Sequence, residues 1–184
     1  MRRLLVLSAP SGAGKTTIAR RLLERHPQWR FAVSATTRQR RPNEVEGKDY
    51  FFLDTAEFQQ RIAEGDLIEW EEVFGNLYGT LRSQIAQQLH TSEEDSRMIF
   101  DVDVKGALSI RAAFPDQAFL LFIAPPSLEE LERRLRDRQT ESAEVQQTRI
   151  NRARMEMEMQ DQFDAVVVND SVERAVQEIE AMLQ

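Results

Sequence analysis

The sequence contains no cysteine and no long run of apolar residues. Without cysteine the chain forms no disulfides and offers no thiolate ligands to a metal. A membrane-spanning helix needs roughly 18 or more apolar residues, but the apolar run Leu4–Leu7 ends at a loop-forming Ser-Ala-Pro-Ser-Gly segment. We therefore expect neither a signal peptide nor a membrane partner, and a cytoplasmic protein.

Lysine is also scarce, whereas arginine is abundant. Of the 24 basic residues, only Lys15, Lys48 and Lys105 are lysine, which leaves 21 arginines. The guanidinium group presents a rigid fork of donors that matches phosphate oxygens, although a biased genomic base composition would raise the arginine content equally well. The formal net charge of −7 disfavours general binding to nucleic acid. The positions of the arginines are therefore more informative than their number.

The order of apolar segments indicates an α/β fold for this chain of 184 residues. Short apolar runs predict buried strands at 4–7, 98–102, 118–124 and 165–168. Helical patterns lie between or after these runs, at 17–25, 83–89, 107–113, 127–138, 145–159 and 172–183. Buried strands that alternate with helices are typical of a parallel sheet covered by helices on both faces.

Residues 33–82 interrupt this alternation. Strand patterns, including one at 68–73, surround a short helix that begins with a capping box of Asp54 and Glu57 and ends near Gly65. We predict a small α+β subdomain inserted into the core.

A second departure is the segment 126–154, which is helical and highly charged. Ser127 and Glu130 form a capping box at its start. This pattern predicts a highly charged helical segment.

The segment from Ala9 to Thr16 follows a strand and opens a helix. It matches the phosphate-loop pattern G-x-x-x-x-G-K-[ST] except for Ala9 at the first position. Gly12 and Gly14 let backbone N–H groups converge, and the helix N-terminus adds partial positive charge. Lys15 is expected to reach the β- and γ-phosphates, and the Thr16 hydroxyl to ligate Mg²⁺. We predict that a nucleoside triphosphate binds here, to Ser11, Gly12, Ala13, Gly14, Lys15, Thr16 and Thr17.

A carboxylate at the end of a neighbouring strand should complement this loop. Asp101, after Ile99 and Phe100, has the expected position and would hold Mg²⁺ directly or through water. A helix cap or a turn is the alternative explanation for Asp101.

An acceptor for the phosphoryl group is indicated by the segment 34–42. It holds three arginines and several hydroxyls, and Tyr50 follows it, so that donors for a phosphate monoester are concentrated here. Glu69 and Asp103 are acceptors that suit the N1–H and N2 amino groups of guanine, whereas adenine would leave them unpaired. Each of these residues alone has a structural explanation, but together they favour a site for phosphate and guanine.

The order and spacing of these segments resemble the guanylate kinases of the nucleoside-monophosphate kinase group across nearly the whole chain. The resemblance rests on residues 8–17, 34–42, 47–52, 68–80, 101–106, 122–135 and 168–170. It implies a P-loop three-layer core formed by residues 1–32, 83–125 and 155–184. It also implies a GMP-binding subdomain at 33–82 and a helical lid at 126–154.

The resemblance further implies roles for individual residues. The GMP phosphate would bind Arg38, Arg41, Tyr50 and Tyr78, and guanine would bind Ser34, Glu69, Thr80 and Asp103. Asn169 and Arg138 would lie near the adenine of ATP. The catalytic residues would be Lys15 and three lid arginines that close over the transferred phosphoryl group, Arg134, Arg138 and Arg149. We expect the other arginines of this segment to face solvent and to pair with nearby glutamates, namely Arg133, Arg136, Arg152 and Arg154.

The sequence departs from the family pattern in places. Asp137 and Gln139 flank Arg138 where glycines are frequent, which puts the flexibility of the lid hinge in question. Ala9 replaces a glycine of some members, and we expect this change to have little effect. Asn43 takes a position that is often glycine, where an asparagine in the left-handed conformation could serve, and Leu77 precedes Tyr78 where a second tyrosine is frequent.

The implied reaction is transfer of the γ-phosphoryl group of ATP to GMP, and to dGMP as well. Three alternatives use the same fold or loop: a non-catalytic guanylate-kinase-like module, a kinase for another acceptor and a GTPase switch. The retained Lys15 and lid arginines argue against the first, and Glu69 with Asp103 argues against the second. The chain lacks the Asn-Lys-x-Asp motif that a GTPase switch would use to bind guanine.

Overall fold

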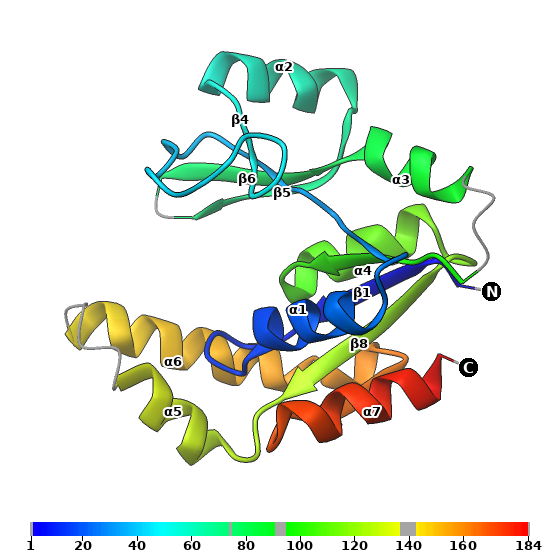
Figure 1. The fold of residues 1–184 in the computed structure, drawn as a ribbon. Helices are drawn as coiled ribbons and strands as arrows, with labels where there is room; N and C mark the ends of the chain where they lie inside the picture. Colours follow the sequence, from blue (N-terminus) through cyan, green and yellow to red (C-terminus); the bar gives the residue numbers. More distant parts are fainter. Residues whose placement is uncertain (1, 74, 91–94, 137–142, 184) are drawn as a thin grey trace.

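The computed structural model describes residues 2–73, 75–90, 95–136 and 143–183, with only the backbone of residues 143–145. The larger part is a five-stranded parallel sheet with helices on both faces (Figure 1). Its strands, in spatial order, are β2 (Arg30–Phe31), β7 (Met98–Asp101), β1 (Leu4–Ser8), β8 (Ala118–Ala124) and β9 (Ala165–Val168). The predicted three-layer α/β core is therefore confirmed.

Side chains along β1 alternate between the two faces of this sheet, as the strand period of two requires. Leu5 and Leu7 belong to a buried cluster with α1 and α7, whereas Leu4 and Val6 belong to a cluster with α3 and α4 on the other face. These helices are α1 (Lys15–Arg25), α3 (Arg82–Leu89), α4 (Val104–Ala113) and α7 (Val172–Met182).

A second sheet forms the small lobe, which we define as β3 to β6 with α2 (Figure 1). Its strand order is β4 (Phe51–Phe52), β3 (Ala35–Thr36), β6 (Asn76–Leu81) and β5 (Leu67–Val73). The covering helix is α2 (Thr55–Glu64). Buried Phe58 of α2 packs against Ala35, Leu67 and Leu81 of the sheet, so that the small lobe has a core of its own.

The helix signals of the small lobe are present where they were predicted. The Asp54 carboxylate accepts a hydrogen bond from the Glu57 N–H, and Gly65 ends the helix in the left-handed conformation with φ of 72°. Outside the small lobe, the Ser127 hydroxyl likewise accepts from the Glu130 N–H at the start of α5 (Leu128–Arg136).

Two strands were missed by the sequence patterns. β2 is too short to show a period, and β6 contains Gly79, which weakens a strand pattern. A Cβ on Gly79 would lie 2.8 Å from the Glu69 carbonyl oxygen and 3.2 Å from the Phe58 ring. Glycine is therefore required here because β5 and α2 pack so closely against β6.

Several helices begin earlier than predicted, and the earlier start of two of them has a clear cause. α1 starts at Lys15 rather than Thr17, because the phosphate loop runs directly into it. α4 starts at Val104 rather than Ala107, because the Asp103 carboxylate caps it by accepting from the Gly106 N–H at 2.7 Å.

The remaining helices follow β8 in the chain. They are α5 (Leu128–Arg136), α6 (Ala143–Glu158) and the short 3-10 helix η1 (Gln160–Gln162). α5 and α6 share a small apolar cluster of Leu131, Leu135, Ile150 and Ala153.

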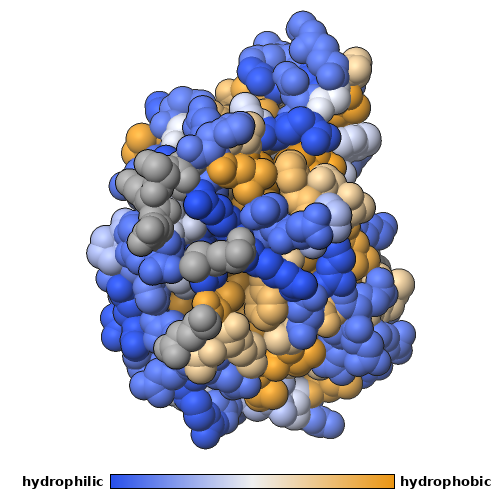
Figure 2. Space-filling model, turned by 90° about the vertical axis from the view of Figure 1, so that its right-hand side faces the viewer, coloured by the Kyte–Doolittle hydropathy of each residue, from blue (hydrophilic) through white to orange (hydrophobic). Residues whose placement is uncertain are grey.

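Among the described residues, no helix is both long and apolar enough to cross a bilayer. Hydrophilic residues cover much of the face shown in Figure 2, and apolar residues surface among them, mostly near the middle of the view.

The small lobe should depend on the ring of Phe58, which is fully buried. We expect Phe58→Ala to lower the free energy of unfolding by about 3–5 kcal/mol, because it removes buried apolar area and leaves a cavity. Chemical denaturation measures this loss. The control Gln59→Ala, at an exposed position of the same helix, should change it little, and equal effects from both variants would contradict the assignment.

Candidate functional site

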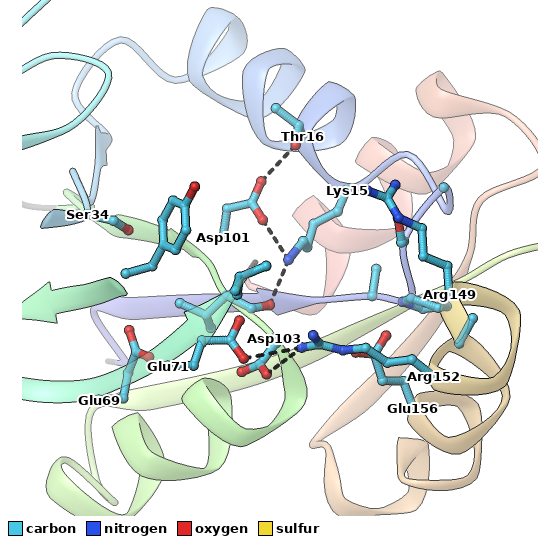
Figure 3. Close-up of a pocket in the computed structure, with 18 of the residues that line it drawn as sticks. Lys15, Thr16, Ser34, Glu69, Glu71, Asp101, Asp103, Arg149, Arg152 and Glu156 are labelled. Atoms are coloured by element: carbon cyan, nitrogen blue, oxygen red, sulfur yellow. Dashed lines mark hydrogen bonds and ion pairs between the residues drawn. The ribbon is translucent and has the colours of Figure 1, made fainter. Parts of the chain in front are cut away.

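A cleft of about 770 Å³ lies between the phosphate loop, the small lobe and α6. Lys15 and Thr16 line it from the loop, Glu69 from β5 and Asp103 from the start of α4, while Arg149 lines it from α6 (Figure 3). Residues that are far apart in the sequence therefore face one shared space.

The loop itself has the backbone that its glycines were predicted to allow. Gly12 and Gly14 have φ of 91° and 90°, in the region that favours glycine. α1 begins immediately afterwards, so the positive end of its dipole faces the cleft.

Asp101 joins the two polar side chains of the loop. The Lys15 ammonium lies 2.6 Å from one oxygen of Asp101 and also donates to the Val102 carbonyl, while the Thr16 hydroxyl donates to the other Asp101 oxygen at 2.8 Å (Figure 3). This contact follows from the sheet, because β1 and β7 are parallel neighbours whose carboxyl ends meet at one edge.

Asn169 lies behind the loop. Its side chain is buried and donates to the Ala13 carbonyl at 2.7 Å. A Cβ on Gly14 would lie only 2.4 Å from the Asn169 amide nitrogen. The structure thus places Asn169 as a support of the loop, and its position near the adenine of ATP stays a prediction.

Glu69 and Asp103 converge at the far side of the cleft. The Thr80 hydroxyl donates to Glu69 at 2.6 Å, and Asp103 accepts from the Gly106 N–H. A Cβ on Gly106 would lie 3.2 Å from an oxygen of each carboxylate, so this glycine leaves room for both. Burial raises the pKa of Glu69 to about 7, against the lowering effect of the Thr80 hydrogen bond.

Of the residues predicted to bind the phosphate and base of the acceptor, some line the cleft and others do not. Ser34, Tyr50 and Tyr78 line the cleft, and the two tyrosine rings meet edge to face with centroids 6.0 Å apart. Arg38 lies beside Tyr50 but donates to the Glu44 carboxylate at 2.6 Å, which raises the pKa of Arg38.

Arg41 is exposed, and its backbone N–H donates to Glu44. Neither Arg38 nor Arg41 lines the cleft in this arrangement. Glu44 therefore contacts both residues of this predicted pair and was not expected from the sequence.

The three predicted catalytic arginines differ in whether they line the cleft. Arg149 lines the cleft. Arg134 does not, and its Nε donates to Glu130 within α5 at 2.9 Å. Arg138 lies outside the described residues, as do Asp137 and Gln139.

Arg152 is exposed and pairs with Glu156, as expected, but it also reaches across the cleft to Glu71 and Asp103, which was not expected (Figure 3). Helical spacing is a signal for this position, because residues three and four apart lie on one face and Arg149, Arg152 and Glu156 have that spacing.

The other three arginines of this segment pair with glutamates as expected. Each is largely exposed, and the pairs are Arg133 with Glu130, and Arg136 and Arg154 with Glu132. Glu71 was also missed, although it follows Glu69 by two residues on a strand and so shares its face.

Comparison with known proteins shows the family to which this chain belongs. A family model for guanylate kinase matches residues 1–184. The chain belongs to the guanylate kinase family. It is 53% identical to a guanylate kinase from Salinibacter ruber, over 96% of this chain and 93% of the relative. It is 49% identical to one from Chlorobaculum tepidum, over 95% and 88% of the two chains.

Solved structures agree with this assignment. The guanylate kinase from Anaplasma phagocytophilum has a TM-score of 0.76 and 34% identity, covering 98% of this chain and 83% of that one. A gluconokinase from Sinorhizobium meliloti has a TM-score of 0.53 at 16% identity, covering 99% and 91%, and shares the fold alone.

Asn169 provides a test of how the loop is supported. We expect Asn169→Ala to raise the KM for ATP and leave the KM for GMP unchanged, because the buried Ala13 carbonyl loses its partner at a cost of about 1–3 kcal/mol. Steady-state kinetics measures both constants. The melting temperature of the nucleotide-free variant should also fall, and an unchanged melting temperature would contradict a supporting role.

Proposed function

We propose that the protein transfers the γ-phosphoryl group of ATP to GMP, and to dGMP, giving ADP and the nucleoside diphosphate. The observation that carries this proposal is the shared cleft. One side presents the phosphate loop with Lys15 and Asp101, and the other presents the paired carboxylates Glu69 and Asp103. The names of the relatives support the same activity.

ATP is proposed to bind along the phosphate loop, from Ser11 to Thr17. Lys15 contacts the β- and γ-phosphates once they displace its ion pair with Asp101. Arg149 faces the same space from α6 and stabilises charge on the phosphoryl group in transit. Arg134 and Arg138 remain proposed members of this group by the resemblance alone.

GMP is proposed to bind between the small lobe and α4. Glu69 and Asp103 accept hydrogen bonds from the N1–H and N2 amino groups of guanine, with Ser34 and Thr80 beside them. The GMP phosphate binds Tyr50, Tyr78, Arg38 and Arg41. For this to occur, the phosphate replaces Glu44 as the partner of Arg38, since both ligands are anions that match the guanidinium fork.

The donor set fits Mg²⁺, the metal that accompanies ATP. Thr16 and Asp101 supply oxygen ligands that already lie 2.8 Å apart, and oxygen ligands are those that this hard cation prefers. Within the described ranges, no group of three or more His, Cys, Asp or Glu side chains could hold a metal. A site of one carboxylate and one hydroxyl is suited to a cation shared with substrate phosphates, and Mg²⁺ would supply charge neutralisation there.

No general base is needed, because the acceptor is a phosphate oxygen. A phosphate monoester has a second pKa of about 6 and is mostly dianionic at neutral pH. The protein therefore acts by positioning and by charge.

Exclusion of water implies that the small lobe and the lid, residues 126–154, close on the core. We place this chemistry in the cytoplasm, without a nucleic-acid or membrane partner.

Lys15 tests the donor half of the site. We expect Lys15→Ala to abolish turnover, because the charge that meets the transferred group is lost, while the affinity for GMP stays within about twofold. Coupled ADP release and calorimetric titration with GMP measure the two effects. Turnover of Lys15→Ala at the wild-type rate would rule out the proposed role of Lys15. Separately, ADP release by the wild-type protein with GMP, dGMP, AMP or UMP defines the acceptor.

Glu69 tests the acceptor half. Only the ionised carboxylate accepts from both guanine donors without offering a proton, so the KM for GMP should fall as the pH rises through about 7. In Glu69→Gln the KM should be higher and the preference over AMP smaller, and the remaining pH dependence should come from the phosphate near pH 6. A variant with unchanged selectivity would show that guanine is recognised elsewhere.

Glu69→Gln should weaken GMP binding but stabilise the nucleotide-free protein at high pH. The pKa of Glu69 is raised from its ordinary 4.5 to about 7, so its contribution to stability is present below pH 4.5 and lost as the pH rises through 7. Glu69→Gln should therefore raise the melting temperature of the nucleotide-free protein at pH 8 and change it little at pH 5.

A further inference from the structure

Arg152 of α6 contacts three carboxylates that come from three parts of the fold. Its Nη2 lies 3.0 Å from Asp103 at the start of α4 and 3.3 Å from Glu71 of β5, and its Nε lies 2.9 Å from Glu156 of α6 (Figure 3). The small lobe, the core and α6 thus meet at one guanidinium group.

Arg152 supplies a donor to one oxygen of Asp103, whose carboxylate also interacts with that of Glu71. Asp103 Oδ1 accepts from the Gly106 N–H at 2.7 Å, while Oδ2 accepts from Arg152. With both oxygens held, the plane of the carboxylate is set. An ionised carboxylate has about four acceptor positions, so each oxygen retains capacity for a donor of the base.

Charge is the second reason why this contact matters. Five carboxylates line the cleft from β5, the start of α4 and α6, those of Glu69, Glu71, Glu72, Asp103 and Glu156. Burial raises the pKa of Glu71 and of Glu156, and Arg152 lowers both. A substrate that brings its own phosphate charge would meet strong repulsion here, and Arg152 offsets it while keeping the acceptors available.

We propose that Arg152 is a positioning residue for GMP, which orients the Asp103 carboxylate toward the base and ties α6 to the base-binding side of the cleft. This inference rests on the proposed function and adds to it a residue that sequence patterns assigned to solvent. Arg152 acts through Asp103 and Glu71, and not on the transferred phosphoryl group.

The opposite role is a latch in which Arg152 competes with guanine for Asp103. The two roles differ in sign, because removal of a latch would strengthen GMP binding. The geometry favours positioning, since Arg152 shares its Nη2 between Asp103 and Glu71 and its side chain is 49% exposed at the border of the cleft.

The test compares Arg152→Gln with Arg154→Gln. Arg154 is two residues away on α6, similarly exposed, and pairs with Glu132 of α5, so it reproduces the loss of charge without the contacts to Asp103 and Glu71. We expect Arg152→Gln to raise the Kd and the KM for GMP about tenfold, as for a lost hydrogen bond to a charged group. The kcat and the KM for ATP should change by less than about twofold, and Arg154→Gln should leave all four constants near wild type.

Arg152→Lys is the conservative variant. Lysine retains the charge but cannot divide two separate nitrogens between Glu156 and the Asp103–Glu71 pair, so its Kd for GMP should lie between those of the wild type and Arg152→Gln. A lysine variant at or above the glutamine value would overturn the inference. Should Arg152→Gln fail to fold, Arg152→Lys against Arg154→Lys supplies the same comparison.

Several results would overturn the inference while leaving the proposed function intact. They are an unchanged or lower Kd for GMP in Arg152→Gln, an equal rise in Arg154→Gln, or a fall in melting temperature without a change in GMP binding. Wild-type protein that binds GMP but transfers nothing to it would instead overturn the proposed function. Absence of both binding and transfer in the wild type would overturn both.

Discussion

The parallel pairing of β1 with β7 is the constraint on which the site depends. Because Leu7 and Asp101 are partners in the register, the chain leaves both strands at the same edge of the sheet. The phosphate loop follows one strand and Asp101 ends the other, so the Lys15 ammonium and the Thr16 hydroxyl meet one carboxylate. Buried apolar clusters on both faces of the sheet hold this pairing, and the loop is further supported by Asn169 from the end of β9.

The base-binding side of the cleft is costly to build. Burial raises the pKa of Glu69, Glu71 and Glu156, which means that the fold loses stability by ionising them at neutral pH. The structure offsets part of this cost locally, with the Thr80 hydroxyl on Glu69 and the guanidinium of Arg152 on its neighbours. Such costs are common at functional sites, where groups are held for a ligand rather than for stability.

Sequence patterns predicted the loop, the parallel core and the small lobe because each has a local signal. Glycines with a lysine between a strand and a helix, short apolar runs and capping residues such as Asp54 all act within a few residues. β6 was missed because Gly79, which close packing requires, weakens its pattern. The missed partners have other causes. Glu44 is one of several acidic residues that follow Arg38, whereas Asp103 and Glu71 lie 49 and 81 positions from Arg152 and only the folded chain brings them together.

The sequence by itself determined the phosphate loop, the alternation of strands and helices, the interruption of that alternation after the first helix and the resemblance to one family. These depend on residue type and short spacing, which the chain carries whatever its tertiary structure. Tertiary structure alone decided that Glu69 and Asp103 converge over Gly106, that Asn169 supports the loop and that Arg152 joins α6 to the base-binding side. Those contacts link residues tens of positions apart, and their energies depend on burial and distance, which exist only once the layers have packed.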